Sequence, residues 1–309
     1  MNGHIPVLLE ECIKYLNIKP DGVYVDGTLG MGGHSEAILQ RLTTGRLISI
    51  DRDELAIERA GERLKAYSER LTIVHGNFRD LDEILDEQGV TAVDGMLFDL
   101  GVSSPQLDEG NRGFSYMLEA QLDMRMDKAD NIDAWFIVNR WPEEKIMRIL
   151  RDYGEERHAA RIAKAIAARR EEKEIQTTTE LVEVIKAAMP AAALREKQHP
   201  AKRSFQAIRI AVNDELGAVA AMMDSAPDRL KQGGRLCVIS FHSLEDRIVK
   251  NAIHARENGC TCPREAPVCT CGFVQTLRSV TRKPITAGGE ELELNPRSRS
   301  AKLRVAERV

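Results

Sequence analysis

The turn at residues 26–33 constrains this chain more than any other stretch. It reads Asp26-Gly27-Thr28-Leu29-Gly30-Met31-Gly32-Gly33. An apolar, strand-like run at 22–25 precedes it, and an amphipathic helical pattern begins at His34. Glycines allow the backbone to approach a ligand closely, and the first N–H groups of a helix are available to it. An acid, a glycine-rich turn and a helix in this order predict a nucleotide-type cofactor site.

The spacing of the glycines narrows the choice of cofactor. The turn does not fit the G-x-G-x-x-G pattern of dinucleotide sites, and no phosphate-binding G-x-x-x-x-G-K-[ST] run occurs in the chain. The next predicted strand, 46–51, ends in Asp51. An acid in that place accepts hydrogen bonds from a ribose diol. This role suits NAD and S-adenosylmethionine equally, so both cofactors stay open on these residues alone.

Composition bounds the class of protein. A chain of 309 residues with 43% hydrophobic and 30% charged residues has room for about two domains. No apolar run approaches the length of a membrane span, and Glu10 and Glu11 interrupt any signal peptide. We therefore expect a cytoplasmic protein with no membrane contact. The six cysteines are then expected to be reduced.

Charge is distributed unevenly along the chain. The net charge of −4 gives no overall sign of nucleic-acid binding. Locally, 273–309 carries eight basic and four acidic residues, and 195–209 carries five basic residues against Glu196. Two basic patches on an acidic body fit a phosphate-binding footprint, although ordinary solvated surface charge explains either patch equally well.

The predicted elements alternate and then change character. Expected strands lie at 22–26, 46–51, 71–75 and 93–99, and expected helices at 6–16, 34–43, 53–67 and 79–87. This alternation predicts an α/β fold with a parallel sheet. Further helices are expected at 143–153, 156–173, 179–188 and 204–221, before a strand returns at 235–241. We expect 1–108 and 214–309 to form one discontinuous cofactor-binding domain, and 109–213 an inserted helical domain for substrate recognition.

The predicted strand at 93–99 leads into the candidate catalytic residues. Asp99 ends it, and the turn Ser103-Ser104-Pro105 follows before Gln106. Ligands of open α/β sheets bind at the carboxyl ends of the strands. Enzymes that methylate exocyclic amines carry a polar residue followed by proline in this place. Acceptors there would bind the amine protons while a methyl group is transferred, and proline would restrict the turn.

These stretches together resemble the RsmH (MraW) family of 16S ribosomal RNA cytosine-N4 methyltransferases. The resemblance runs in order through nearly the whole chain, at 4–11, 26–35, 51–53, 99–107, 112–115, 122–127, 153–157, 205–216, 239–247 and 295–300. It implies a class I, Rossmann-like methyltransferase sheet with an inserted all-α domain. It also implies S-adenosylmethionine as cofactor and, as partner and substrate, a decoding-centre cytosine of 16S rRNA in the small ribosomal subunit. The oligomeric state stays open, and a homodimer is compatible with the sequence.

The resemblance implies a set of cofactor contacts. They fall on Gly32, Gly33, His34, Asp51, Phe78, Asp99 and Gln106. Gln106 replaces the aromatic residue that usually ends the proline turn of amine methyltransferases. Another ring must then stack on the base, and Phe114, Tyr116 and Phe241 are candidates that serve equally well as core.

Each of three other polar residues has two possible roles. Arg112 and Arg125 either hold RNA phosphates or pair with neighbouring acids such as Asp123 and Asp127. His242 either faces the substrate or caps a helix.

Four cysteines form a candidate metal site. Cys260, Cys262, Cys269 and Cys271 occur as two C-x-C pairs within twelve positions. Four thiolates suit tetrahedral zinc, although the pairs are tighter than the usual C-x₂-C. Zinc here is expected to stabilise a loop, with thiols that bind no metal as the alternative. Cys12 and Cys237 are expected in the core.

Two alternatives to the methyltransferase remain. One is a non-catalytic RNA-binding ribosome-assembly factor that has kept the fold. The other is an NAD-dependent oxidoreductase, which the glycine spacing disfavours.

Overall fold

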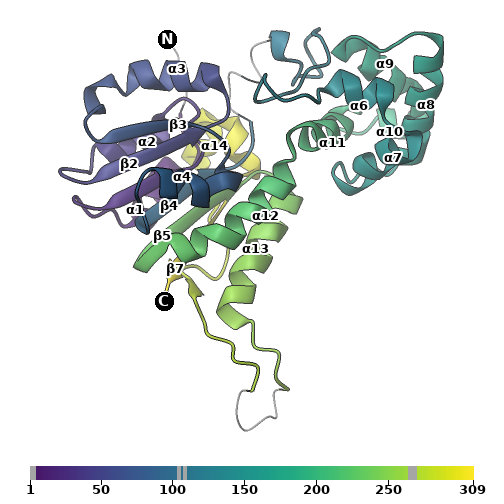
Figure 1. The fold of residues 1–309 in the computed structure, drawn as a ribbon. Helices are drawn as coiled ribbons and strands as arrows, with labels where there is room; N and C mark the ends of the chain where they lie inside the picture. Colours follow the sequence, from purple (N-terminus) through teal and green to yellow (C-terminus); the bar gives the residue numbers. More distant parts are fainter. Residues whose placement is uncertain (1–4, 103–105, 107–109, 264–269) are drawn as a thin grey trace. The chain divides into compact units, whose positions relative to one another are not determined.

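The structure is a computed structural model that describes residues 5–102, 106, 110–263 and 270–309. The chain divides into two compact units. Unit 1 comprises 1–101 and 216–309, and unit 2 comprises 102–215. Unit 2 is thus inserted in the sequence of unit 1 (Figure 1).

Unit 1 is built on one seven-stranded sheet. The strands are β1 Val23–Asp26, β2 Arg46–Asp51, β3 Leu71–His75, β4 Val93–Asp99, β5 Leu230–Ser240, β6 Leu277–Ser279 and β7 Lys302–Arg308. Their order is β3-β2-β1-β4-β5-β7-β6. β1 to β5 are parallel, whereas β7 is antiparallel to both β5 and β6. The predicted parallel sheet is confirmed, and β6 and β7 lie in the tail for which no strand was predicted.

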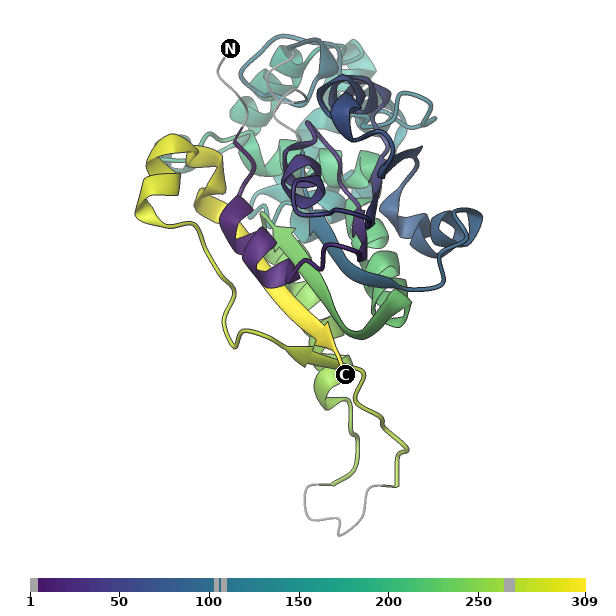
Figure 2. The same cartoon turned by 90° about the vertical axis from the view of Figure 1, so that its left-hand side faces the viewer.

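Helices cover both faces of this sheet, as Figures 1 and 2 show. The helices of unit 1 are α1 Leu9–Leu16, α2 Gly33–Leu39, α3 Glu54–Arg63, α4 Leu81–Glu87, α12 Glu215–Ser225, α13 Ser243–Asn258 and α14 Gly289–Leu294, of which α14 buries no residue. Side chains of a strand alternate between the two faces. Buried residues of α1, α2 and α3 pack with Tyr24, Leu47 and Leu97, and those of α4, α12 and α13 pack with Val25 and Ile48. Two hydrophobic layers therefore hold the sheet rigid beneath its carboxyl edge.

Unit 2 is helical. Its helices are α6 Ala134–Arg140, α7 Glu143–Asp152, α8 Ala159–Glu172, α9 Thr178–Ala188, α10 Ala191–Leu194 and α11 Lys202–Asn213. One hydrophobic core joins them, and Ile162, Ile166 and Ile208 are fully buried within it. α9 begins after the N-cap Thr177, which forms a capping box with Glu180.

The predicted helix at 204–221 is wrong. The chain instead forms α11 and α12, separated by Asp214, whose φ is 46°. The side chain of Asn213 accepts from the N–H of Met126 and donates to the carbonyl of Met124, 2.8 Å in each case. These buried bonds to a distant loop end α11, although the apolar period continues.

Within the described residues, every helix is too short or too polar to cross a membrane.

Candidate functional site

Three carboxylates lie at one edge of the unit 1 sheet. Asp26, Asp51 and Asp99 are the last residues of β1, β2 and β4. β1 pairs in parallel with β2 on one side and β4 on the other, so the three strands end at the same edge. This edge is where ligands of open α/β sheets bind. The structure therefore brings together Asp51 and Asp99, which were predicted as site residues, and adds Asp26.

The glycine-rich turn is attached to these strand ends by hydrogen bonds. The backbone N–H groups of Thr28 and Gly30 donate to the carboxylates of Asp26 and Asp51, at 3.1 and 2.7 Å. The N–H of Asp99 donates to the hydroxyl of Thr28 at 2.7 Å, and the hydroxyl of Ser35 donates to Asp26 at 2.7 Å. The acids therefore shape the turn before any ligand binds.

Gly32 and Gly33 meet two different steric demands. Gly32 is the N-cap of α2 with φ of 76°, a conformation that side chains other than glycine rarely adopt. A Cβ on Gly33 would lie 2.2 Å from Cγ of Pro6. The N-terminal segment therefore packs directly on the turn. Neither glycine can gain a side chain without moving the backbone that surrounds the site.

His34 connects the N-terminal segment to Asp99. Its side chain is buried, its Nε2 lies 3.0 Å from the carbonyl oxygen of Val7, and its Nδ1 lies 3.7 Å from Oδ2 of Asp99. Because a carbonyl only accepts, Nε2 carries the proton and donates. His34 is therefore held in one orientation beside the carboxylate that ends β4.

The electrostatics of the edge are unusual because its three acids have no lysine or arginine partner among the described residues. Burial raises the pKa of Asp51 to about 6 and the pKa of Asp26 above its ordinary value. The pKa of Asp99 is raised well above its usual range, first by burial and then by the charges of Asp26 and Glu245. Among the described residues, no lysine or arginine pairs with Asp26, Asp51 or Asp99. The edge is thus suited to a ligand that carries positive charge.

Asp99 also has an oxygen that the described structure leaves without a partner. Its Oδ1 is buried and no described residue hydrogen-bonds to it. A buried acceptor of this kind costs stability unless a ligand satisfies it. The observation therefore indicates a donor on a bound molecule at this position.

Phe78 lies just beyond the carboxyl end of β3. It starts the short helix Phe78–Asp80, and its ring meets Phe98 edge-to-face with centroids 5.9 Å apart. Asn77 caps this short helix by accepting from the N–H of Arg79. The aromatic ring of Phe78 is therefore held in place near the sheet edge at which Asp51 ends β2.

Four predicted site residues belong to the segment after β4. Ser103, Ser104 and Pro105 lie outside the described residues. Gln106 is buried and belongs to unit 2. The catalytic role predicted for the Ser-Ser-Pro turn therefore stays a prediction, as does the cofactor contact of Gln106.

Sequence reasoning missed two acids. Asp26 was noted only as the start of the turn, yet it is fully buried and shapes it. Glu245 is 1% exposed and forms a capping box with His242, the N-cap of α13. The signal for Glu245 was its place three residues after His242, close to a predicted strand end, which is the spacing of a capping box. His242 is therefore a helix cap, one of the two roles considered for it.

The candidate RNA contacts in unit 2 are two arginines and two aromatic residues. Arg125 pairs with Asp123 at 2.7 Å, and Arg112 donates to the carbonyls of Arg125 and Met126, so both guanidiniums organise a loop. Phe114 is 5% exposed and belongs to the core. Tyr116 stacks on His199 with centroids 4.6 Å apart.

Within the predicted basic stretch 195–209, the segment 195–203 carries exposed cations. Arg195, Lys197 and Lys202 are exposed, and no described acid pairs with them. In the tail, by contrast, ion pairs occupy four cations, with Arg278 on Glu307, Lys302 and Arg304 on Asp246, and Arg308 on Asp228. Half of the eight tail cations are thus paired within unit 1.

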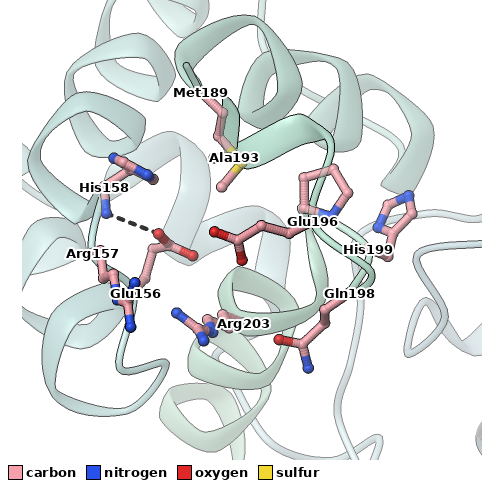
Figure 3. A pocket seen from close by; sticks show the side chains of 10 residues that line it. Glu156, Arg157, His158, Met189, Ala193, Glu196, Gln198, His199 and Arg203 are labelled. Atoms are coloured by element: carbon pink, nitrogen blue, oxygen red, sulfur yellow. Dashed lines mark hydrogen bonds between the residues drawn. The ribbon is translucent and has the colours of Figure 1, made fainter. Parts of the chain in front are cut away.

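A pocket opens beside this basic segment within unit 2 (Figure 3). Its charged lining mixes Glu156 and Glu196 with Arg157 and Arg203. The N–H of His158 donates to Glu156 at 2.8 Å, which fixes that carboxylate on the pocket wall. The pocket offers both donors and acceptors, as a polar ligand requires.

The cysteine cluster is partly described. Cys260, Cys262 and Cys271 place their sulfur atoms within 4.8 Å of one another, whereas Cys269 lies outside the described residues. Cys12 and Cys237 are buried in the core, as predicted.

The sheet order and the site together define a class I methyltransferase. β7 lies antiparallel between β5 and β6, and a glycine-rich turn joins the acid that ends β1 to α2, next to an acid that ends β2. A family model described as the MraW methylase family matches residues 1–309. The chain belongs to this family, and the resemblance seen in the sequence is confirmed.

Known proteins similar to this chain include close relatives. A ribosomal RNA small subunit methyltransferase H of Brevibacillus brevis is 54% identical over 307 residues, 99% of this chain and 98% of the relative. A protein of the same name from Heliobacterium mobile is 54% identical over 308 residues, 99% of each. The crystal structure of an rRNA methylase from Streptococcus thermophilus aligns over 99% of each chain at 13% identity, with a TM-score of 0.42.

Proposed function

We propose that this protein transfers a methyl group from S-adenosylmethionine to the N4 amine of a decoding-centre cytosine in 16S rRNA of the small ribosomal subunit. The observation that carries the proposal is the group of three strand-end carboxylates that pair with no described lysine or arginine, in a chain of the MraW methylase family. The names of the relatives support small-subunit rRNA as the substrate. The reaction would take place in the cytoplasm.

The residues at the edge fit S-adenosylmethionine better than NAD. When bound, S-adenosylmethionine supplies a methyl group on a positively charged sulfur. Asp51, which shapes the turn through Gly30, would accept hydrogen bonds from the ribose diol, and Phe78 would border the adenine. The pyrophosphate of NAD would instead bring negative charge to an edge that already holds three acids. The charge of the site therefore disfavours the oxidoreductase.

Asp99 is the proposed acceptor for the target amine. The lone pair of the cytosine N4 amine is conjugated with the ring and poorly available. An acceptor on its protons favours pyramidal geometry and disperses the positive charge that develops on nitrogen. Oδ1 of Asp99 is buried and has no partner among the described residues. The positive charge of the cofactor would favour the ionised form of this carboxyl, whose pKa is raised without it, so that Oδ1 could accept a proton of the amine.

Unit 2 is proposed to recognise the RNA. The exposed cations of 195–203 would contact phosphates, and the adjacent pocket would hold a polar group of the substrate. The predicted limits of the inserted domain, 109–213, lie inside the unit that spans 102–215.

The test is methyl transfer from labelled S-adenosylmethionine to undermethylated small subunits, with nucleoside analysis of the product. N4-methylcytidine is the expected product, and the Asp99→Ala protein should yield none. A methylated nucleoside other than N4-methylcytidine would overturn the proposed target atom.

A genetic test separates the enzyme from the assembly factor. Asp99→Ala that binds 16S rRNA normally but does not methylate should fail to restore N4 methylation in a deletion strain. If it nevertheless restored subunit assembly in full, the non-catalytic role would be favoured.

A further inference from the structure

The described arms of the connection between α13 and β6, 259–263 and 270–276, extend away from the sheet of unit 1 (Figures 1 and 2). None of its described residues, 259–263 and 270–276, is buried, and Val274 is 74% exposed. At its base, the N–H of Thr276 donates to the carbonyl of Arg256, and the ring of Phe273 packs against Gly259. Segments this small need a disulfide or a metal when they cannot bury apolar surface.

Three cysteines meet where the two arms of this connection approach each other. Sγ of Cys260 lies 3.7 Å from Sγ of Cys271, and Sγ of Cys262 completes a group whose atoms are all within 4.8 Å. A disulfide requires about 2.05 Å between the sulfur atoms. Two thiolates that each lie about 2.3 Å from one tetrahedral zinc ion are about 3.8 Å apart. The observed spacing therefore fits a shared metal ion and not a bond between the sulfurs.

The backbone near the sulfurs has the form expected around metal-bound thiolates. The N–H of Thr270 donates to Sγ of Cys262 at 3.2 Å, so the second arm holds the first through sulfur. Gly272 follows Cys271 with φ of 70° and has open space around it. A glycine in this conformation turns the chain directly after a ligand. Hydrogen bonds to ligand atoms orient and support metal sites.

We propose that Cys260, Cys262 and Cys271 bind one Zn²⁺ ion that joins the two arms of the 259–276 connection. Each thiol gives up its proton to solvent when it coordinates, and no oxidant is involved. The fourth coordination position is left to a ligand outside these three residues. The ion has a structural role, because the cysteine cluster contains none of the carboxylates Asp26, Asp51 and Asp99 of the proposed cofactor site.

The test begins with the full-length protein purified without chelators. Elemental analysis should find one zinc per chain. Replacement by Co²⁺ should produce thiolate-to-cobalt charge-transfer absorption together with the visible bands of tetrahedral cobalt. Cys260→Ser, Cys262→Ser and Cys271→Ser should each lose most of the zinc and the charge-transfer band. Removal of zinc should speed proteolytic cleavage within 259–276.

Two controls make the result specific. Thr261→Ala changes the same arm without removing a sulfur, and should keep the zinc. Cys12→Ala removes a thiol from the core, and should keep it too. Binding of S-adenosylmethionine should persist in all variants, which separates this proposal from the proposed function. Zinc far below one per chain in protein whose thiols are reduced would overturn the site, as would a Cys260–Cys271 disulfide in protein isolated from the cytoplasm.

Discussion

At the scale of single residues, the site consists of well-ordered carboxylates whose negative charge is energetically unfavourable where they lie. Asp26, Asp51 and Asp99 each hold the end of a strand or the turn in place, yet burial disfavours their ionised forms. A protein that binds a cationic cofactor gains from such a site, because the ligand supplies the missing charge. Stability and cofactor affinity should therefore respond to pH in ways that identify individual acids.

In the protein without cofactor, Asp99→Asn should change how the free energy of unfolding depends on pH. The pKa of Asp99 is raised by folding, so its folded form binds a proton more tightly than the unfolded chain. Its contribution to the free energy of unfolding therefore declines as pH rises from about 4 through the raised folded value. Relative to wild type, Asp99→Asn should gain stability between pH 5 and pH 7.5, by at most about 1.4 kcal/mol per pH unit. Urea unfolding at several pH values measures it.

Asp94→Asn is the control of opposite sign. Burial raises the pKa of Asp94, but hydrogen bonds from Lys231, Val23 and Lys19 outweigh it, and the pKa is lowered overall. Its stabilising effect is present above the unfolded value and disappears only in stronger acid. Asp94→Asn should therefore be destabilised equally at pH 5 and pH 7.5. A constant difference for Asp99→Asn as well would contradict the raised pKa.

Binding of S-adenosylmethionine should weaken in acid because of Asp51. Its pKa is about 6, and only the ionised carboxylate accepts two ribose hydroxyl protons while also accepting from Gly30. The affinity measured by calorimetry should fall as pH decreases from 8 through 6. Asp51→Asn should bind about tenfold or more weakly at pH 8 and respond much less to pH. Equal affinity of wild type at pH 8 and pH 5 would rule out this role.

At the scale of elements, the turn before α2 depends on close packing that only a glycine permits. Gly33→Ala would place a methyl group within 2.2 Å of Pro6, a ring that cannot rotate away. We expect a decrease of about 1–3 kcal/mol in the free energy of unfolding. We also expect weaker binding of S-adenosylmethionine, because the N-terminal segment must shift. Thermal unfolding and calorimetry test the two effects.

Gly61→Ala provides the matched control in α3. The new methyl would lie 3.9 Å from Ile73, an ordinary contact, and Gly61 lies inside a regular helix. The change should stabilise the protein by about 0.5–1 kcal/mol and leave the cofactor affinity unchanged. Equal effects of the two substitutions would show that the packing on Gly33 is not specific.

At the scale of the whole molecule, acidic and basic residues gather in different places. The net charge is −4, and the acids at the sheet edge concentrate negative potential where the cofactor is proposed to bind. Exposed cations of unit 2 lie in 195–203. An acidic protein can therefore present a local basic patch, which its overall composition does not predict.

Removal of this patch should weaken RNA binding without harm to the cofactor site. A triple substitution to alanine of Arg195, Lys197 and Lys202 should reduce affinity for small subunits. It should also flatten the plot of log affinity against log salt by roughly 0.7–0.9 for each phosphate that the variant no longer neutralises. The affinity for S-adenosylmethionine should stay at the wild-type value. Filter binding over a salt series measures the slope.

A second triple substitution tests whether position or only charge matters. Arg148, Arg161 and Lys164 are exposed cations of α7 and α8 in the same unit. Their replacement by alanine removes the same charge, and should change the salt dependence far less. Equal decreases in affinity from both triples would attribute binding to net charge and contradict a defined patch.

The sequence alone determined the parallel strands and the order of the cofactor site. β2, β3 and β4 have the bounds predicted for them, 46–51, 71–75 and 93–99, because the strands of a parallel sheet are rich in apolar residues. The glycine turn, Asp51 and Asp99 were also predicted, since an acid at a strand end and a glycine-rich turn are local signals. The family resemblance was specific because its motifs occur in order along the chain.

Other features were decided only by tertiary contacts. The break at Asp214 follows from bonds between Asn213 and a distant loop, and β7 forms because β5 offers it an edge. The raised pKa of Asp99 requires its burial near Asp26, which is distant in the sequence. Local patterns record which residues are apolar, polar or flexible. They do not record which residues distant in the sequence come into contact. Burial, coupling between charges and antiparallel strand pairing all depend on those contacts.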